Sequence, residues 1–445
     1  MEIVLIKAAQ LILSLSLLVI IHEFGHFLFA RIFKTRVEKF YLFFDPWFSL
    51  FKVKKGDTEY GVGWLPLGGY VKISGMIDES MDKEAMKLPP QSHEFRSKKT
   101  WQRLLIMVGG VLMNFILAFI IYIGILYAWG EQYLPTANVK YGIEVDSIGR
   151  QIGLQNGDKI LSVANHEVEN FHKIIPTVIL DKAPTIQVER EGQKVDVEIS
   201  DDDLALLIKS RGVMTFRLPF DYQIAKFSKN SVAKDAGLQE GDQILGLDSL
   251  RYEFYDQFRA ALKDSIGKEI TLNVMRNNQE MNFKLVVPES AMLGIQLAQD
   301  FEKIFEFKTI EYGLIESIPA GFRKGINTIN DYLKQFKLIF SPKTKAYESL
   351  GGFIAIGNIF PGIWDWHSFW NMTAFLSIIL GVMNLLPIPA LDGGHVMFLL
   401  FEMITGRKPG DKFLEYAQIA GMVLLLSLVL FANGNDLFKL WKQYF

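Results

Sequence analysis

The chain has 445 residues, half of them hydrophobic, and its mean hydropathy is positive at +0.18. These values exclude a typical soluble protein and indicate a polytopic membrane protein. The chain has 47 Lys and Arg residues against 49 Asp and Glu residues. Because this leaves no basic excess to neutralise phosphates, we expect no nucleic-acid partner. There is no cysteine, so any metal site must use His, Asp or Glu.

Four segments approach the roughly 20 apolar residues that a helix needs to cross a bilayer. The first, Ile3 to Ala30, is too long for a removable signal peptide and has no small-residue cleavage site after it. The other three are Leu104 to Trp129, Phe369 to Ala390 and Ala417 to Ala432. We place the spans at 1–33, 103–130, 368–390 and 414–434. Residues 135–345 are dense in polar side chains, so the spans flank a soluble middle segment.

Basic residues set the expected orientation. Arg31, Lys34, Arg36, Lys39, Lys52, Lys54, Lys55, Lys98, Lys99 and Arg103 all lie between the first two spans. By the positive-inside bias, the loop 34–102 is cytoplasmic. The short link 391–413 is then cytoplasmic too. Both termini, including the tail 435–445, and the soluble middle segment lie outside.

The first span ends in His22-Glu23-Phe24-Gly25-His26. Imidazoles at i and i+4 share one helix face and can ligate one tetrahedral zinc ion. Glu23 can take a proton from the attacking water and pass it to the leaving amine. An ionisable residue in a span costs at least about 2.5 kcal/mol on insertion scales, so three together need a function or a partner. The alternative is a structural polar contact between helices.

A short β structure is predicted after the first span. Apolar residues alternate imperfectly with glycines around Pro66 between Gly61 and Lys72, which predicts a hairpin in a membrane-associated β region at 57–75. An exposed edge could pair with an extended substrate through backbone hydrogen bonds, and a plain interfacial hairpin is the alternative. In the second span, Gly109, Gly110 and Asn114 fit close helix packing and one interhelical hydrogen bond.

The soluble segment contains an internal repeat. Residues 146–161 align with 229–245 through shared Gly-Leu, Gly-Asp and Ile-Leu pairs, which predicts two copies of one domain at 133–215 and 218–300. The pattern resembles PDZ domains of the protease-associated type, which bind peptides by β-augmentation. We expect the grooves at Tyr141, Gly142 and Ile143 in the first copy and at Phe220, Tyr222 and Ile224 in the second. The alternative is a steric filter or scaffold.

Two further features complete the chain. Apolar residues at helical spacing from Ile310 to Phe340 predict an amphipathic helix at the outer membrane surface, within the segment 305–365. After the third span, Pro387 and Pro389 stop the helix, and two glycines let the chain turn tightly around Asp392.

Asp392 is the candidate third metal ligand. The expected topology brings its carboxylate to the membrane depth of His22 and His26, so we expect one zinc ion among the three. An ordinary capped turn is the alternative for Asp392. We expect His395 beside the metal without ligating it.

These motifs, in this order and over nearly the whole chain, resemble the site-2 protease family. The resemblance rests on His22–His26, Gly61–Lys72, Met107–Phe115 and Asn384–Gly394. It implies zinc bound by His22, His26 and Asp392, with Glu23 as the catalytic acid and base. It also implies that the substrate is accommodated by Asn384, Pro387, Gly61, Gly63, Gly68 and Gly69. The paired PDZ domains would exclude substrates with bulky outer portions.

The expected fold is a polytopic α-helical membrane protein with four transmembrane helices, a membrane-associated β-hairpin loop and two inserted extracytoplasmic PDZ domains. The expected function is zinc-dependent cleavage of single-pass membrane proteins in the bilayer of the bacterial inner membrane. By resemblance, the substrates are an anti-sigma factor after a first cut, and signal-peptide remnants. The rivals are a membrane-anchored tandem PDZ scaffold with a structural metal site, and a zinc transporter, which would not need Glu23 beside a ligand histidine.

Overall fold

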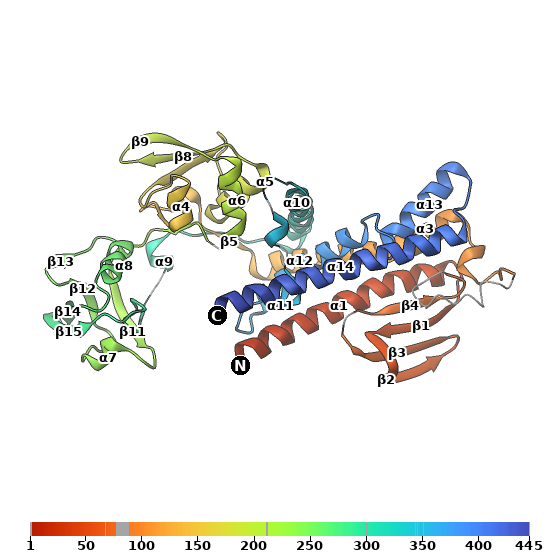
Figure 1. Cartoon of the computed structure of the whole chain (residues 1–445), viewed down its shortest axis with the longest axis horizontal. Helices are drawn as coiled ribbons and strands as arrows, with labels where there is room; N and C mark the ends of the chain where they lie inside the picture. Colours follow the sequence, from red (N-terminus) through yellow and green to blue (C-terminus); the bar gives the residue numbers. More distant parts are fainter. Residues whose placement is uncertain are drawn as a thin grey trace. The chain divides into compact units, whose positions relative to one another are not determined.

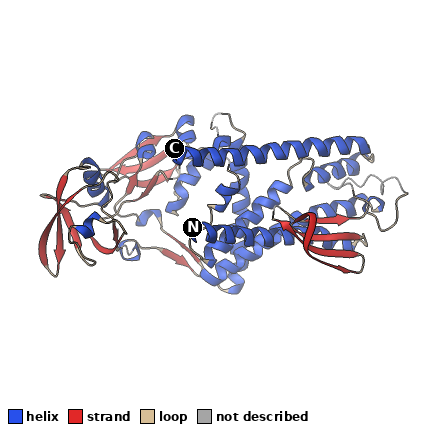
Figure 2. Ribbon diagram, turned by 60° about the horizontal axis from the view of Figure 1, so that its bottom comes forward, coloured by secondary structure: helices blue, strands red, loops and turns tan. Residues whose placement is uncertain are grey.

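The computed structural model describes residues 2–66, 68–76, 89–210, 212–298, 301–342, 344, 346–349 and 351–444. The chain divides into two compact units. The first comprises residues 1–131, 311–337 and 347–445, and the second comprises 132–310 and 338–346. The first unit is helical apart from one small sheet, whereas strands predominate in the second (Figure 2).

Four helices of the first unit are long and apolar enough to cross a membrane, as the sequence predicted. They are α1 (Glu2–Ile32), α3 (Thr100–Trp129), α12 (Trp366–Asn384) and α14 (Asp411–Tyr444). Both chain ends lie at the same end of this unit (Figure 1). The apolar residues of α14 are largely exposed, as expected of a helix that faces lipid.

Helices α1 and α3 approach each other through glycines. A Cβ atom on Gly25 would lie 2.2 Å from the carbonyl oxygen of Gly109, and one on Gly109 would lie 2.7 Å from the carbonyl oxygen of Gly25. Only residues without a side chain allow two helix backbones this close. The contact lies next to His22 and His26, so it brings α3 against the imidazoles.

The β region is a four-stranded sheet in the order β2-β3-β1-β4, lying beside the second half of α1 (Figure 1). Its strands are β1 (Val37–Leu42), β2 (Phe44–Lys55), β3 (Thr58–Leu65) and β4 (Tyr70–Ile73). The predicted hairpin over 61–72 is therefore wrong: β1 lies between β3 and β4, parallel to the first and antiparallel to the second. Trp47, Phe48 and Phe51 on β2 are exposed, which suits a sheet at a membrane surface.

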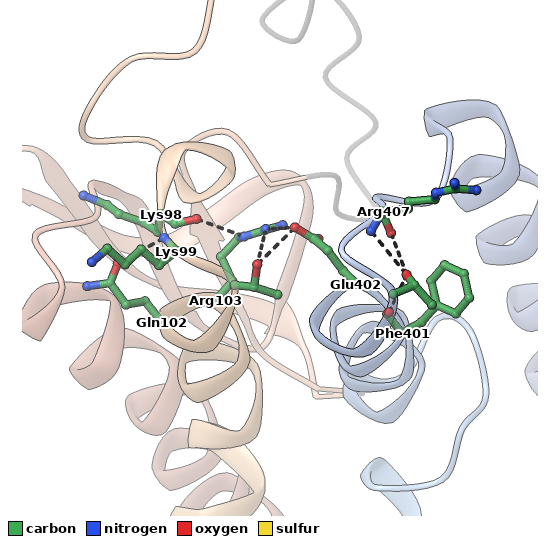
Figure 3. Close-up of polar contacts among 9 residues, drawn as sticks. Lys98, Lys99, Gln102, Arg103, Phe401, Glu402 and Arg407 are labelled. Carbon is green, nitrogen blue, oxygen red and sulfur yellow. Dashed lines mark hydrogen bonds and ion pairs between the residues drawn. The ribbon is translucent and has the colours of Figure 1, made fainter.

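The expected link 391–413 is largely a helix, α13 (Asp392–Thr405), which ends at Gly406 in a left-handed conformation. From the sequence we expect a link here, without a helix assigned to it. Helix α13 packs against α3, with Leu399 in a core that includes Ile106 and Met107. Near its far end, Arg103 of α3 donates a hydrogen bond to the Glu402 carboxylate, and both side chains are nearly buried (Figure 3). This ion pair joins the beginning of α3 to the end of α13.

The amphipathic helix is α10 (Leu314–Ile339), and the short helix α11 (Phe353–Gly357) follows it. A Cβ on Gly321 of α10 would lie 2.6 Å from the Ile123 side chain of α3, and the Phe119 and Phe322 rings stack at 4.2 Å. Apolar residues such as Ile315 remain exposed on α10. The segment after α11 is held against α1, because the Gln10 side chain of α1 donates a hydrogen bond to the carbonyl oxygen of Pro361.

The second unit contains two separate hydrophobic cores. The elements around the first are β5 (Glu131–Tyr133), β6 (Ile143–Val145), α4 (Ser147–Gln151), β7 (Lys159–Val163), α5 (Ile174–Asp181), β8 (Thr185–Arg190), β9 (Gln193–Glu198), α6 (Asp201–Lys209) and β10 (Met214–Phe216). Those around the second are β11 (Tyr222–Phe227), α7 (Val232–Asp235), β12 (Gln243–Leu247), β13 (Leu250–Arg251), α8 (Tyr255–Asp264), β14 (Glu269–Arg276), β15 (Gln279–Val286) and β16 (Ile295–Leu297). After β16 the chain forms α9 (Phe301–Ile304) and β17 (Lys308–Ile310), and β17 pairs with β5.

The Gly-Asp pair of each sequence copy has the same surroundings. Asp158 accepts two hydrogen bonds from Arg190, and Asp242 accepts two from Arg276. Each aspartate also accepts a backbone N–H three residues before it. The aligned copies therefore share this local structure.

The expected peptide grooves need correction. Strand β6 pairs with β10 on one edge, and on the other Ile143 exchanges backbone hydrogen bonds with Gly157 and Asp158. Strand β11 lies between β12 and β16. Strands paired on both edges cannot accept a peptide. Moreover Ile143 and Ile224 are buried in the two cores, and Tyr222 is buried against Tyr255. Phe220 packs against the second core, Gly142 lies against Gly157, and Tyr141 contacts Phe254.

Candidate metal centre and active site

Three donor atoms from two helices meet at one point. The Nε2 atoms of His22 and His26 lie 3.3 Å apart, and the Oδ2 atom of Asp392 lies 3.1 Å from the first and 3.3 Å from the second. A tetrahedral zinc ion with bonds of about 2.0–2.1 Å separates its ligands by roughly 3.3 Å. Asp392 Oδ2 is also buried without a hydrogen-bond partner among the described residues. The donor set therefore fits zinc, as the sequence predicted.

Helix α3 shapes the space around the imidazoles. The Nδ1 atom of His26 lies 2.9 Å from the carbonyl oxygen of Ile106, and Nδ1 of His22 lies 3.1 Å from the amide nitrogen of Asn114. Between these two contacts, a Cβ on Gly110 would lie 2.5 Å from Nε2 of His26. Gly110 therefore leaves the room that the donor atoms occupy.

Asp392 begins helix α13, and the preceding loop fixes it there. A Cβ on Gly393 would lie 2.1 Å from the carbonyl oxygen of Leu386, and one on Gly421 of α14 would lie 1.6 Å from the carbonyl oxygen of Pro389. The loop is therefore folded tightly on itself and on α14. The two glycines after Asp392 lie within α13 without a positive φ, so this close approach requires them and the tight turn expected from sequence does not.

Glu23 is half-buried and faces the same cavity as the three donors. This cavity has a volume of about 690 Å³ and lies between α1, the sheet and the start of α13. Gly69, just before β4, comes so close that a Cβ there would lie 3.3 Å from Cγ of Glu23 and 2.7 Å from the Val19 side chain. The edge of the sheet thus lies beside the candidate acid and base.

The cavity also has polar walls that the sequence did not reveal. Lys39, Asp45, Tyr70 and Lys72 of the sheet line it, together with His395. The Tyr70 hydroxyl donates a hydrogen bond to Asp45, and burial and the Asp45 carboxylate raise the pKa of Tyr70. No local motif marks these residues, because they meet only when β1, β2 and β4 are assembled.

The residues expected to accommodate substrate have different surroundings. The Asn384 amide lies 3.4 Å from Nε2 of His22, so it is at the metal centre, whereas Pro387 is exposed in the loop. Gly61 packs against the Tyr41 ring and Gly63 against the Phe44 backbone, so both have close neighbours inside the sheet. Gly68 has a φ of +149° and lies near the Phe44 ring.

The chain is similar in sequence to known proteins over nearly its whole length. The model of peptidase family M50 matches residues 10–428. The regulator of sigma E protease of Haemophilus influenzae is 28% identical over 96% of this chain and 98% of its own length. Protease RseP of Yersinia pestis is 27% identical over 98% of this chain and 99% of its own length. A Borreliella burgdorferi protein, named provisionally as a zinc metalloprotease, is 28% identical over 96% of this chain and 97% of its own length.

Proposed function

Because the chain belongs to peptidase family M50, the site-2 proteases that its motifs resembled, we propose that it is a zinc-dependent endopeptidase that cuts transmembrane segments within the bilayer. The observation that carries the proposal is the meeting of His22, His26 and Asp392 beside Glu23, among helices long enough to span a membrane.

His22, His26 and Asp392 would hold one zinc ion, which supplies Lewis acidity and lowers the pKa of water to about 7. Glu23 lines the cavity beside these donors and would take the proton of the attacking water. The same carboxyl would then give this proton to the leaving amine. The Asn384 amide, 3.4 Å from Nε2 of His22, would donate to the peptide carbonyl of the substrate.

A peptide bond inside a helix must be exposed before it can be cut, and β4 offers a way to hold the opened chain. This strand is at the edge of its sheet, and all four of its residues, Tyr70 to Ile73, line the cavity. An extended substrate could add to β4 through backbone hydrogen bonds, which makes binding tolerant of side-chain identity. Gly69 keeps β4 close to Glu23, and Gly61, Gly63 and Gly68 support the same sheet.

Orientation in the membrane follows from the basic loops. We place the sheet, α13 and the metal centre toward the cytoplasmic face of a bacterial inner membrane, with both termini and the second unit in the periplasm. This assignment agrees with the termini sharing one end of the helical unit (Figure 1).

The second unit would act on the outer part of the substrate. We assign its two halves to PDZ-type domains. The strands expected at the peptide grooves, β6 and β11, pair with β10 and β16, and each of these partners lies at the end of its sheet. Peptide binding would belong at those two edges. The main role that we propose for the pair is to exclude substrates with a bulky periplasmic portion.

The substrates that we propose are single-pass membrane proteins already trimmed outside the membrane. Several relatives, the Haemophilus influenzae protein among them, are named for regulation of sigma E. By analogy, a membrane-spanning anti-sigma factor after its first cleavage is the leading candidate, and remnants of signal peptides are a second class.

The test is cleavage of a model transmembrane helix by detergent-purified Glu23→Gln protein. We expect zinc content like that of the wild type and no cleavage, because only the proton-transferring group changes. Glu240→Gln, at an exposed glutamate of the second unit, is the control and should cut normally. Cleavage by Glu23→Gln would refute the mechanism. Zinc without cleavage in the wild type would favour the scaffold alternative.

A further inference from the structure

One stripe of α3 contacts both imidazoles of the metal centre. Ile106, Gly110 and Asn114 are spaced four residues apart, so they lie on one helix face. Ile106 and Asn114 meet the Nδ1 atoms of His26 and His22, and Gly110 lies between them against both rings. None of these three residues is itself a metal donor.

The contact of His26 defines its proton arrangement. A backbone carbonyl can only accept a hydrogen bond, so Nδ1 of His26 carries a proton that it donates to the oxygen of Ile106 at 2.9 Å. Its Nε2 atom is then the lone-pair nitrogen and points at Asp392 and His22. This is the arrangement that a metal-ligating histidine needs.

His22 needs the same arrangement, but the atom nearest to its Nδ1 is a hydrogen-bond donor. With Nε2 directed to the ion, Nδ1 must carry the proton, yet the atom 3.1 Å away is the amide nitrogen of Asn114, also a donor. Meanwhile Oδ1 of the same fully buried amide has no hydrogen-bond partner among the described residues. The two ends of an asparagine amide have nearly the same shape, and the network decides between them. Turning the amide by 180° places Oδ1 beside Nδ1 of His22, so that Oδ1 gains a donor and Nδ1 gains an acceptor.

We propose that Asn114 is a positioning residue whose amide oxygen accepts the Nδ1 proton of His22 and so directs Nε2 of His22 to the metal. The proposal rests on the proposed zinc site. It gives the interhelical hydrogen bond expected from sequence a specific role, because Asn114 then acts as an acceptor, which an apolar residue of equal size cannot do. Such outer partners of ligating histidines commonly change metal affinity about 10- to 100-fold when they are removed.

The test compares zinc affinity, by chelator competition in detergent, among full-length variants. Asn114→Leu keeps the size and loses the acceptor, so we expect zinc to bind 10- to 100-fold more weakly. Asn114→Asp keeps only acceptor atoms and should bind within about threefold of the wild type. Ser377→Ala is the matched control, because the buried Ser377 hydroxyl donates to the backbone oxygen of Asn114 and not to its amide.

The melting temperatures of the metal-free proteins separate positioning from folding. We expect Asn114→Asp and Asn114→Leu to differ in zinc affinity far more than in metal-free melting temperature. Equal weakening in both variants, or an unchanged affinity in Asn114→Leu, would overturn the acceptor role while the zinc site stands. A wild-type protein that binds no zinc would overturn the proposed function and this proposal with it.

Discussion

Replacing Gly110 by alanine would place a methyl group where the metal donors meet. The added Cβ would lie 2.5 Å from Nε2 of His26 and 2.8 Å from Cε1 of His22, whereas ordinary contact begins at 3.4 Å. The nitrogen would have to retreat by about 0.9 Å, several times the roughly 0.2 Å by which a metal–ligand distance can vary. We therefore expect zinc affinity to fall at least about tenfold, which is about 1.4 kcal/mol.

The assay is zinc competition with a chelator on detergent-purified protein, with cleavage of a model helix as a second readout. Gly124→Ala is the matched control on the same helix, because a Cβ at Gly124 meets nothing within 4 Å. Its intrinsic effect on helix stability, about 1 kcal/mol in favour of alanine, is shared by both variants. If Gly110→Ala bound zinc as tightly as Gly124→Ala, the inferred crowding of the donors by α3 would be refuted.

Three further outcomes can be measured. Glu402→Ala leaves Arg103 nearly buried without its partner, so thermal unfolding should show a loss of roughly 3 kcal/mol, while Glu306→Ala, which removes an exposed ion pair, should change little. Gly69→Ala should lower the cleavage rate with zinc retained, because its Cβ would push the sheet edge away from Glu23; normal turnover would count against the role of β4. Burial raises the pKa of the Asp242 carboxyl, but its hydrogen bonds, chiefly those from Arg276, and the Arg276 charge together have the larger effect, so the pKa lies below its usual value of 3.8. The stability that this pair adds is therefore fully present above pH 3.8 and is lost as the pH falls through the lowered pKa. The difference in melting temperature between the wild type and Arg276→Met should shrink from about pH 7 to about pH 3. A constant difference would contradict the assignment.

The meeting of His22, His26 and Asp392 could be predicted from sequence because each step used local information. The spacing of His22 and His26 fixes a shared helix face, and the prolines after α12 mark where the chain leaves the helix before Asp392. The distribution of lysine and arginine then set the depth of both segments. Once the two segments are expected at the same membrane depth, the three donor side chains are expected to lie close together.

Other parts depended on partners that are distant in the chain. The alternation over 61–72 was read as a hairpin, but β3 and β4 both pair with β1, which no turn signal indicates. The grooves of the second unit were placed on β6 and β11 because those strands adjoin the repeated motif. Whether a strand edge is open depends on which segment returns to it. Here β10 pairs with one edge of β6 and residues 157–158 bond to the other, whereas β11 lies between β12 and β16. Helix α13 was missed because its flanking glycines and basic residues suggested a link.

Helix α3 carries no metal donor, yet it restrains the helices that do. Its residues 103, 106, 110 and 114 follow the i, i+3, i+7, i+11 spacing of a single face. The two middle positions and Asn114 contact the imidazoles of α1, and Arg103 holds α13, which begins with Asp392. The distance between the ligands of α1 and the ligand of α13 is therefore set largely by one rigid element. The span in which the sequence indicated helix packing and one interhelical hydrogen bond thus defines the geometry of the candidate metal centre.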